Sequence, residues 1–182
     1  MIDLARRRLL QGRFGRTPAP VHPPWSDDEA LRERCTRCGA CAEACPEGIV
    51  VAGSGGLPEV DFSRGECTFC RACGEACPEP IFDFGRPAWT LGAAVGDACL
   101  AGRGVYCQSC KDACPEGAIG FAPVLGSVPR PGIDLAACTG CGACVSACPA
   151  DAITVSAAVG EGGAREGGAR EDGAGEARGS GA

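Results

Sequence analysis

The sequence is poor in the residues that build a large hydrophobic core. Aromatic residues make up 5% of the 182-residue chain, and 29 glycines and 14 prolines dilute a hydrophobic content of 45%. A chain of this length holds one ordinary domain or two small ones, and small domains bury so little surface that many depend on metals or disulfides. We therefore expect small modules that need support beyond hydrophobic packing.

The sequence also lacks the features of several functional classes. No stretch approaches the roughly 20 apolar residues of a membrane span, and no apolar segment of the signal-peptide kind follows the basic start MIDLARRRLLQGRFGR. The chain has one histidine, His22, no Gly-rich phosphate loop and no nucleophile–base arrangement. These absences predict a soluble, cytoplasmic protein that has no membrane span and is not an enzyme.

Acidic residues outnumber basic ones outside the start of the chain. The formal net charge is −6, and the first 25 residues carry +4 from five arginines and Asp3, which leaves −10 for residues 26–182. Binding to nucleic-acid phosphates needs a basic face. We therefore expect no nucleic-acid partner.

Cysteine, by contrast, is abundant and regularly spaced. All 16 cysteines fall between Cys35 and Cys148. Three copies of one run share the same spacing: Cys35-x2-Cys38-x2-Cys41-x3-Cys45-Pro46, Cys67-x2-Cys70-x2-Cys73-x3-Cys77-Pro78 and Cys138-x2-Cys141-x2-Cys144-x3-Cys148-Pro149. The remaining copy is stretched at its start, Cys99-x7-Cys107-x2-Cys110-x3-Cys114-Pro115, and the four copies leave no cysteine over.

This spacing is typical of two-cluster bacterial ferredoxins, in which three cysteines of a run hold one cluster and the fourth holds the other. Zinc ribbons separate their cysteine pairs by longer spacers, and disulfides are rare in a reducing cytoplasm, so both alternatives are less favoured. We expect four 4Fe–4S clusters with these ligands: Cys35, Cys38, Cys41 and Cys77; Cys67, Cys70, Cys73 and Cys45; Cys138, Cys141, Cys144 and Cys114; and Cys99, Cys107, Cys110 and Cys148. The last set is the least well defined, because seven residues separate its first two cysteines.

The distances between runs divide the chain into two modules. The close-packed runs begin at residues 35, 67, 107 and 138, so two short steps flank a longer one. A short apolar segment with strand character follows each Cys-Pro, at residues 49–51, 81–82, 118–119 and 152–155, and partner strands are expected at 58–62 and 133–135. A short helix fits the residues between the third cysteine of each run and its Cys-Pro.

The predicted fold class is therefore α+β, with two tandem ferredoxin-like modules, each built around two clusters. The expected division is a basic, Pro-rich N-terminal arm at 1–31, module 1 at 32–90, module 2 at 91–156 and a Gly/Ala/Arg/Glu tail at 157–182. The composition of the tail cannot bury a core, which predicts disorder there.

Segments flanking the runs resemble the NapF family, ferredoxin-type proteins associated with periplasmic nitrate reductase systems. The resemblance covers about residues 1–156 and is carried by these segments: Asp3-Leu4-Ala5-Arg6-Arg7-Arg8-Leu9-Leu10-Gln11-Gly12-Arg13, Pro23-Pro24-Trp25, Cys35-Thr36-Arg37-Cys38, Gly96-Asp97-Ala98-Cys99-Leu100 and Cys138-Thr139-Gly140-Cys141-Gly142-Ala143-Cys144. These flanking signatures are more specific than the cysteine spacing, which many polyferredoxins share.

The resemblance implies a cytoplasmic accessory protein whose partner is the catalytic subunit of the nitrate reductase, a molybdoenzyme. The implied role is to assist maturation of that subunit, or to supply electrons to it, before export. The clusters alone support a second interpretation, a general electron carrier between redox partners.

Overall fold

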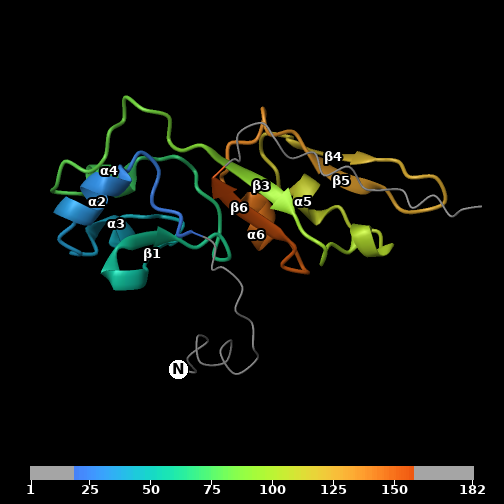
Figure 1. The fold of residues 1–182 in the computed structure, drawn as a ribbon, viewed down its shortest axis with the longest axis horizontal. Helices are drawn as coiled ribbons and strands as arrows, with labels where there is room; N and C mark the ends of the chain where they lie inside the picture. The colour runs from blue at the N-terminus through green and yellow to red at the C-terminus, as the bar shows by residue number, and fades with distance from the viewer. Residues whose placement is uncertain (1–18, 158–182) are drawn as a thin grey trace, which may run out of the picture.

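The computed structural model describes residues 19–157, which form two modules of short helices and strands (Figure 1). The first 18 residues of the expected arm and the expected disordered tail from residue 158 onward lie outside the described residues. The predicted α+β class with two tandem modules is confirmed. None of the helices within residues 19–157 has the length and hydrophobicity that a membrane span requires.

Module 1 is built on one β-hairpin and three helices. Its elements in chain order are α2 (Asp28–Arg34), α3 (Ala40–Glu43), β1 (Val50–Ala52), the 3-10 turn η1 (Ser54–Gly56), β2 (Pro58–Val60) and α4 (Ala72–Glu75). β1 and β2 pair antiparallel with Val50 opposite Val60, so the partner strand predicted at 58–62 is present but ends at residue 60. The hairpin turns at Gly55, whose φ of 67° suits glycine.

Module 2 has two antiparallel strand pairs. Its elements are β3 (Leu91–Val95), η2 (Ala101–Arg103), α5 (Ser109–Asp112), β4 (Ile119–Ala122), β5 (Arg130–Ile133), α6 (Ala143–Ser146) and β6 (Ile153–Ala157). β4 and β5 form a hairpin, whereas β6 pairs with β3, the first strand of the module, along five residues. The ladder between β3 and β6 therefore ties the start of the module to its end.

The predicted strand at residues 81–82 is wrong. This segment follows the second Cys-Pro, as β6 follows the fourth, but it makes only an isolated bridge between Phe82 and Ser26. Its neighbour is the Pro-rich segment of residues 19–25, and proline has no N–H to donate to a ladder. The segment is instead held by single bonds, such as Asp27 N–H to the Ile81 carbonyl at 3.2 Å and Asp83 N–H to the Trp25 carbonyl at 2.9 Å.

The described part of the arm packs on module 1. The Val60 N–H donates to the carbonyl of Val21 at 2.7 Å, and the Nδ1 atom of His22 lies 2.8 Å from the Pro58 carbonyl oxygen. The boundary expected between residues 31 and 32 falls inside α2, whose Leu31 is 1% exposed. The Asp27 side chain caps this helix by accepting from two backbone N–H groups, and the bond from Ala30 is the main reason why the pKa of Asp27 is lowered.

Four one-turn helices carry the third cysteine of each run. α3, α4, α5 and α6 each span four residues, and the third cysteine is the second residue of each. The predicted short helices are present, but they begin one residue before that cysteine. Because helices of this length have no stability alone, their environment must hold them.

That environment contains cysteine as well as aliphatic side chains. One buried cluster consists of Ile49, Val50 and Cys73, and the other of Ala93, Cys110, Ile119, Cys144 and Ile153. Partly buried cysteines pack against both clusters. The cores of the two modules are therefore arranged around sulfur.

Candidate metal centres

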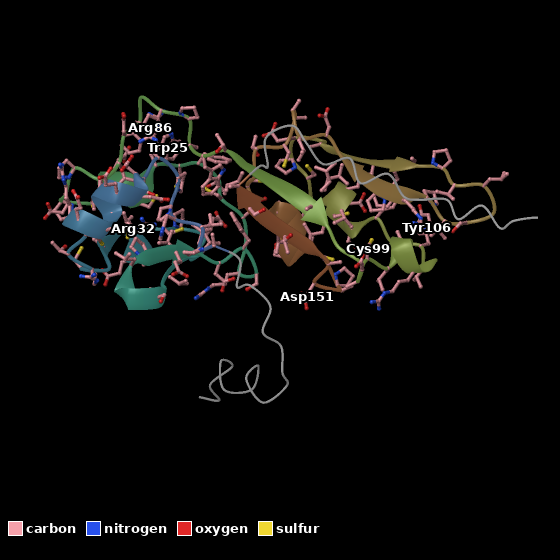
Figure 2. All side chains as sticks on the ribbon, viewed as in Figure 1. Trp25, Arg32, Arg86, Cys99, Tyr106 and Asp151 are labelled. Atoms are coloured by element: carbon pink, nitrogen blue, oxygen red, sulfur yellow. The ribbon has the colours of Figure 1, made fainter. Side chains whose placement is uncertain are left out.

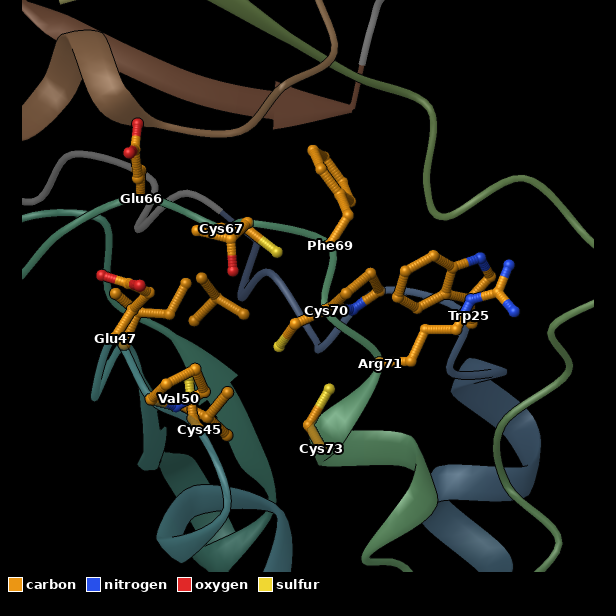
Figure 3. A pocket seen from close by; sticks show the side chains of 15 residues that line it. Trp25, Cys45, Glu47, Val50, Glu66, Cys67, Phe69, Cys70, Arg71 and Cys73 are labelled. Carbon is orange, nitrogen blue, oxygen red and sulfur yellow. The ribbon is translucent and has the colours of Figure 1, made fainter. Parts of the chain in front are cut away.

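Four of the cavities within residues 19–157 are each lined by four cysteines. The four groups are Cys45, Cys67, Cys70 and Cys73; Cys35, Cys38, Cys41 and Cys77; Cys114, Cys138, Cys141 and Cys144; and Cys99, Cys107, Cys110 and Cys148. These groups have the same members as the four sets predicted from the sequence. Figure 3 shows the first of them, in which Cys45 faces Cys67, Cys70 and Cys73 across the cavity.

The fourth cysteine of each group comes from the other run of the same module. Contacts between α3 and α4, and between α5 and α6, bring the paired runs together. After three of the four Cys-Pro pairs a residue adopts positive φ: Gly48 in the first run, Gly117 in the third and Asp151 in the fourth. The exchange of ligands within a module is therefore built into its packing.

The sulfur atoms suit a multi-atom cluster better than a single ion. None of the 16 cysteines is in a disulfide, and in residues 19–157 no three His, Cys, Asp or Glu side chains come close enough together to hold one metal ion. A tetrahedral zinc site would need four sulfurs about 2.3 Å from one point. A 4Fe–4S cube, which takes one thiolate at each iron, keeps its four ligands farther apart.

Burial raises the pKa of the thiols that lie deepest. It is the main cause that raises the pKa of Cys73 and of Cys144 to about 12 and that of Cys67 to about 11. Charges on neighbouring cysteines add to the effect, and for Cys67 these include Cys141 of the other module. Since iron binds the thiolate, filling these cavities must release protons.

Three of the four runs share an unusual backbone. In each, the residue before the second cysteine and the residue after it have positive φ: Arg37 and Gly39 (58° and 84°), Phe69 and Arg71 (54° and 68°), Gly140 and Gly142 (72° and 85°). Two left-handed residues around one cysteine curl the loop so that its sulfurs face one cavity. Each costs about 1–2 kcal/mol when it is not glycine, so the three non-glycine residues must be held by contacts.

The Cys99 run reaches its cavity by another route. Its residue after the second cysteine, Gln108, has a φ of −132°, and Cys99 enters through the turn η2 rather than through a two-residue loop. In Figure 2, Cys99 and Tyr106 lie on the side of module 2 away from module 1, and the Tyr106 side chain is 69% exposed. The longer spacing thus changes the loop but still brings Cys99 to Cys107, Cys110 and Cys148.

Aromatic contacts hold the strained loop of the second run. The Arg71 guanidinium lies 5.6 Å from the ring centre of Trp25 and 5.3 Å from that of Phe84, and Phe69 packs edge-on against Trp25 at 6.2 Å. Figure 3 shows Arg71 and Trp25 side by side at the rim of the cavity. Cation–π contacts of this kind stabilise the arrangement by about 0.5–1 kcal/mol each at exposed sites, which offsets part of the backbone cost.

We expect Arg71→Met to lower the reduction potential of one cluster and leave three unchanged. Arg71 is the only cationic residue lining the Cys45, Cys67, Cys70 and Cys73 cavity among the described residues, and removing a positive charge disfavours the reduced, more negative cluster. The shift should be on the order of tens of millivolts, since solvent screens this exposed side chain. A redox titration followed by EPR would measure it, with Arg64→Met as the control because Arg64 is exposed and lines none of the four cavities.

Sequence reasoning missed the residues that support the loops. Trp25 belongs to one of the segments that carry the family resemblance, but its supporting role, like those of Arg71 and Trp89, comes from contacts with distant segments that no local pattern marks. One signal was available, because six of the nine aromatic residues fall between residues 25 and 89. Such a concentration in a chain with few aromatics indicates a shared packing role.

Comparison with known proteins agrees with the four cavities. The chain matches a family described as the 4Fe–4S dicluster domain over residues 34–81 and again over 105–152, and a second family of the same description over 130–178. The match over residues 105–152 begins after Cys99, because the spacing between Cys99 and Cys107 differs from that in the other three runs. Two dicluster domains with 16 cysteines provide for four 4Fe–4S clusters, as predicted.

Individual relatives cover nearly the whole chain. The sequence is 45% identical over 155 residues to the ferredoxin-type protein NapF of Escherichia coli (strain K12). This alignment covers 84% of this chain and 94% of that protein. It is 39% identical over 166 residues to the ferredoxin-type protein NapF of Haemophilus influenzae, with 85% and 94% covered. These shares leave little of either relative without a counterpart here.

Proposed function

Because this chain belongs to the NapF family of ferredoxin-type proteins, we propose that it is a cytoplasmic accessory protein of periplasmic nitrate reductase. Its proposed role is to assist maturation of the catalytic subunit, or to supply electrons to it, before export. The observation that carries the proposal is the match to relatives over 94% of their length, together with four cavities that each have four cysteines.

Each four-cysteine cavity is proposed to hold one 4Fe–4S cluster through the set of thiolates that lines it. A bound cluster takes up and gives back a single electron. The chain supplies the ligands, and its backbone N–H groups donate to sulfur, as Arg37 does to Cys35 Sγ at 3.4 Å and Ala152 does to Cys148 Sγ at 3.3 Å. Such bonds stabilise the reduced, more negative state and so help to set the potential.

The partner can be identified by anaerobic affinity purification from nitrate-respiring cells. We expect the tagged protein to retain a molybdoenzyme catalytic subunit that still bears its export signal. A variant in which Cys38 and Cys107 are replaced by alanine, and which therefore lacks two clusters, shows whether retention depends on a loaded protein. Recovery of many reductases and dehydrogenases, or of no stable partner, would instead indicate a general electron carrier.

A further inference from the structure

The two modules meet through the ligand loops themselves. The backbone N–H of Cys67 in module 1 donates to the carbonyl of Cys141 in module 2 at 2.8 Å. These two cysteines line different cavities. A direct hydrogen bond thus joins the loop of one proposed cluster site to the loop of another across the boundary between modules.

Aromatic side chains of module 1 flank this bond. The Trp89 ring donates its Nε1–H to the carbonyl of Thr139, two residues before Cys141, at 2.9 Å. Trp89 also packs edge-on against Phe62 at 5.9 Å and against Phe69 at 5.6 Å. We call Phe62, Trp89, the Cys67 N–H and residues 139–142 the seam.

The seam leaves no room for a side chain at Gly142. A Cβ atom on Gly142 would lie 2.0 Å from Cδ1 of Phe62, whose side chain is 7% exposed and cannot move aside freely. Gly39 holds the same position in the first run with nearly the same φ, 84° against 85°, yet a Cβ there would meet nothing within 4 Å. The first and fourth runs therefore share a backbone requirement for glycine, and only the fourth adds a packing requirement.

We propose that the seam is a positioning device that holds the two inner cluster sites, lined by Cys67 and by Cys141, against each other. The four clusters then form one interacting series instead of two independent pairs. Phe62, Trp89 and Gly142 act as positioning residues. They lie in the ligand loops or against them, and none of them supplies a sulfur ligand to either site. The inference rests on the ligand sets proposed above.

The test isolates the two inner sites. In a Cys38→Ala/Cys107→Ala chain each outer set loses a ligand, so that one cluster remains in each module. EPR spectra of this chain after reduction with dithionite should show spin–spin broadening, which can arise only across the seam. Adding Gly142→Ala or Trp89→Leu should reduce this broadening severalfold with no further loss of iron, whereas Gly39→Ala should leave it unchanged.

Two results would overturn the proposal. One is an absence of broadening in the parent double variant with two clusters bound, and the other is broadening that survives both Gly142→Ala and Trp89→Leu. Iron content separates these results from a failure of the ligand sets, because a double variant that keeps all four clusters would refute the sets and not the seam. Where the double variant does not retain clusters, microwave power saturation of the chain with all 16 cysteines provides the same comparison between Gly142→Ala and Gly39→Ala.

Discussion

Removing iron from the protein with a chelator under anaerobic conditions should abolish the cooperative fold of both modules. The reason lies in how little of the interior is hydrocarbon. Leu31 and Ile49 are the largest fully buried side chains of residues 19–157, and the strands span only three to five residues. The expected loss is on the order of the whole stability of a small domain, about 5–15 kcal/mol, because cluster binding and folding are one equilibrium.

Circular dichroism and thermal melting of the loaded and the stripped protein would measure this loss. The loaded protein should melt in a cooperative transition, and the stripped protein should show little helix or strand signal and no transition. Reconstitution with iron and sulfide should restore both, which controls for damage during chelation. A stripped protein with native-like secondary structure and a sharp transition would show that the hydrophobic clusters suffice.

Replacing Cys45 by alanine should remove the cluster of the second run, not that of its own run. The cavity that contains Cys45 is otherwise lined by Cys67, Cys70 and Cys73, while Cys77 lies with Cys35, Cys38 and Cys41. Cys45→Ala and Cys77→Ala are each expected to lower the iron content by about four atoms, which is one cluster. Iron content alone does not tell which cluster is lost, so a marker is needed.

Arg71 supplies that marker, because it lines only the cavity that contains Cys45 among the four. In a Cys45→Ala background the shift of potential caused by Arg71→Met should disappear, since its cluster is gone. In a Cys77→Ala background the shift should persist. The reverse pattern would mean that each run holds its own cluster and that ligands are not exchanged.

The cysteine sets could be predicted from the sequence because their information is local and repeated. Spacing within a run places three sulfurs on one loop, and the Cys-Pro turn sends the fourth elsewhere. Even Cys99, which seven residues separate from Cys107, could be assigned because the other three sets left no alternative partner. In the structure the 16 cysteines line four separate cavities, four to each.

Features that depend on distant segments could not be predicted. β3 reads LGAAV, which has no clear strand signal, and its partner β6 lies about 60 residues later in the chain. Residues 81–82 have the local character of a strand, but the Pro-rich segment beside them cannot complete a ladder. Likewise, positive φ at Phe69 and Arg71 contradicts their local preference and is tolerated only because Trp25, Phe84 and Trp89 pack around them.

The pairing of β3 with β6 also orders events during synthesis. Module 1 has both of its four-cysteine groups and the contacts that close it once residue 89 has left the ribosome. These contacts include the bond from the Trp25 N–H to the Ala88 carbonyl and the packing of Trp89 on Phe62 and Phe69. Module 2 cannot close until β6, ending at Ala157, has emerged. Since domains fold as units and the N-terminal one folds first, module 1 can be complete before the β3–β6 ladder of module 2 has formed. We therefore expect module 1 to be able to accept its clusters before module 2 can.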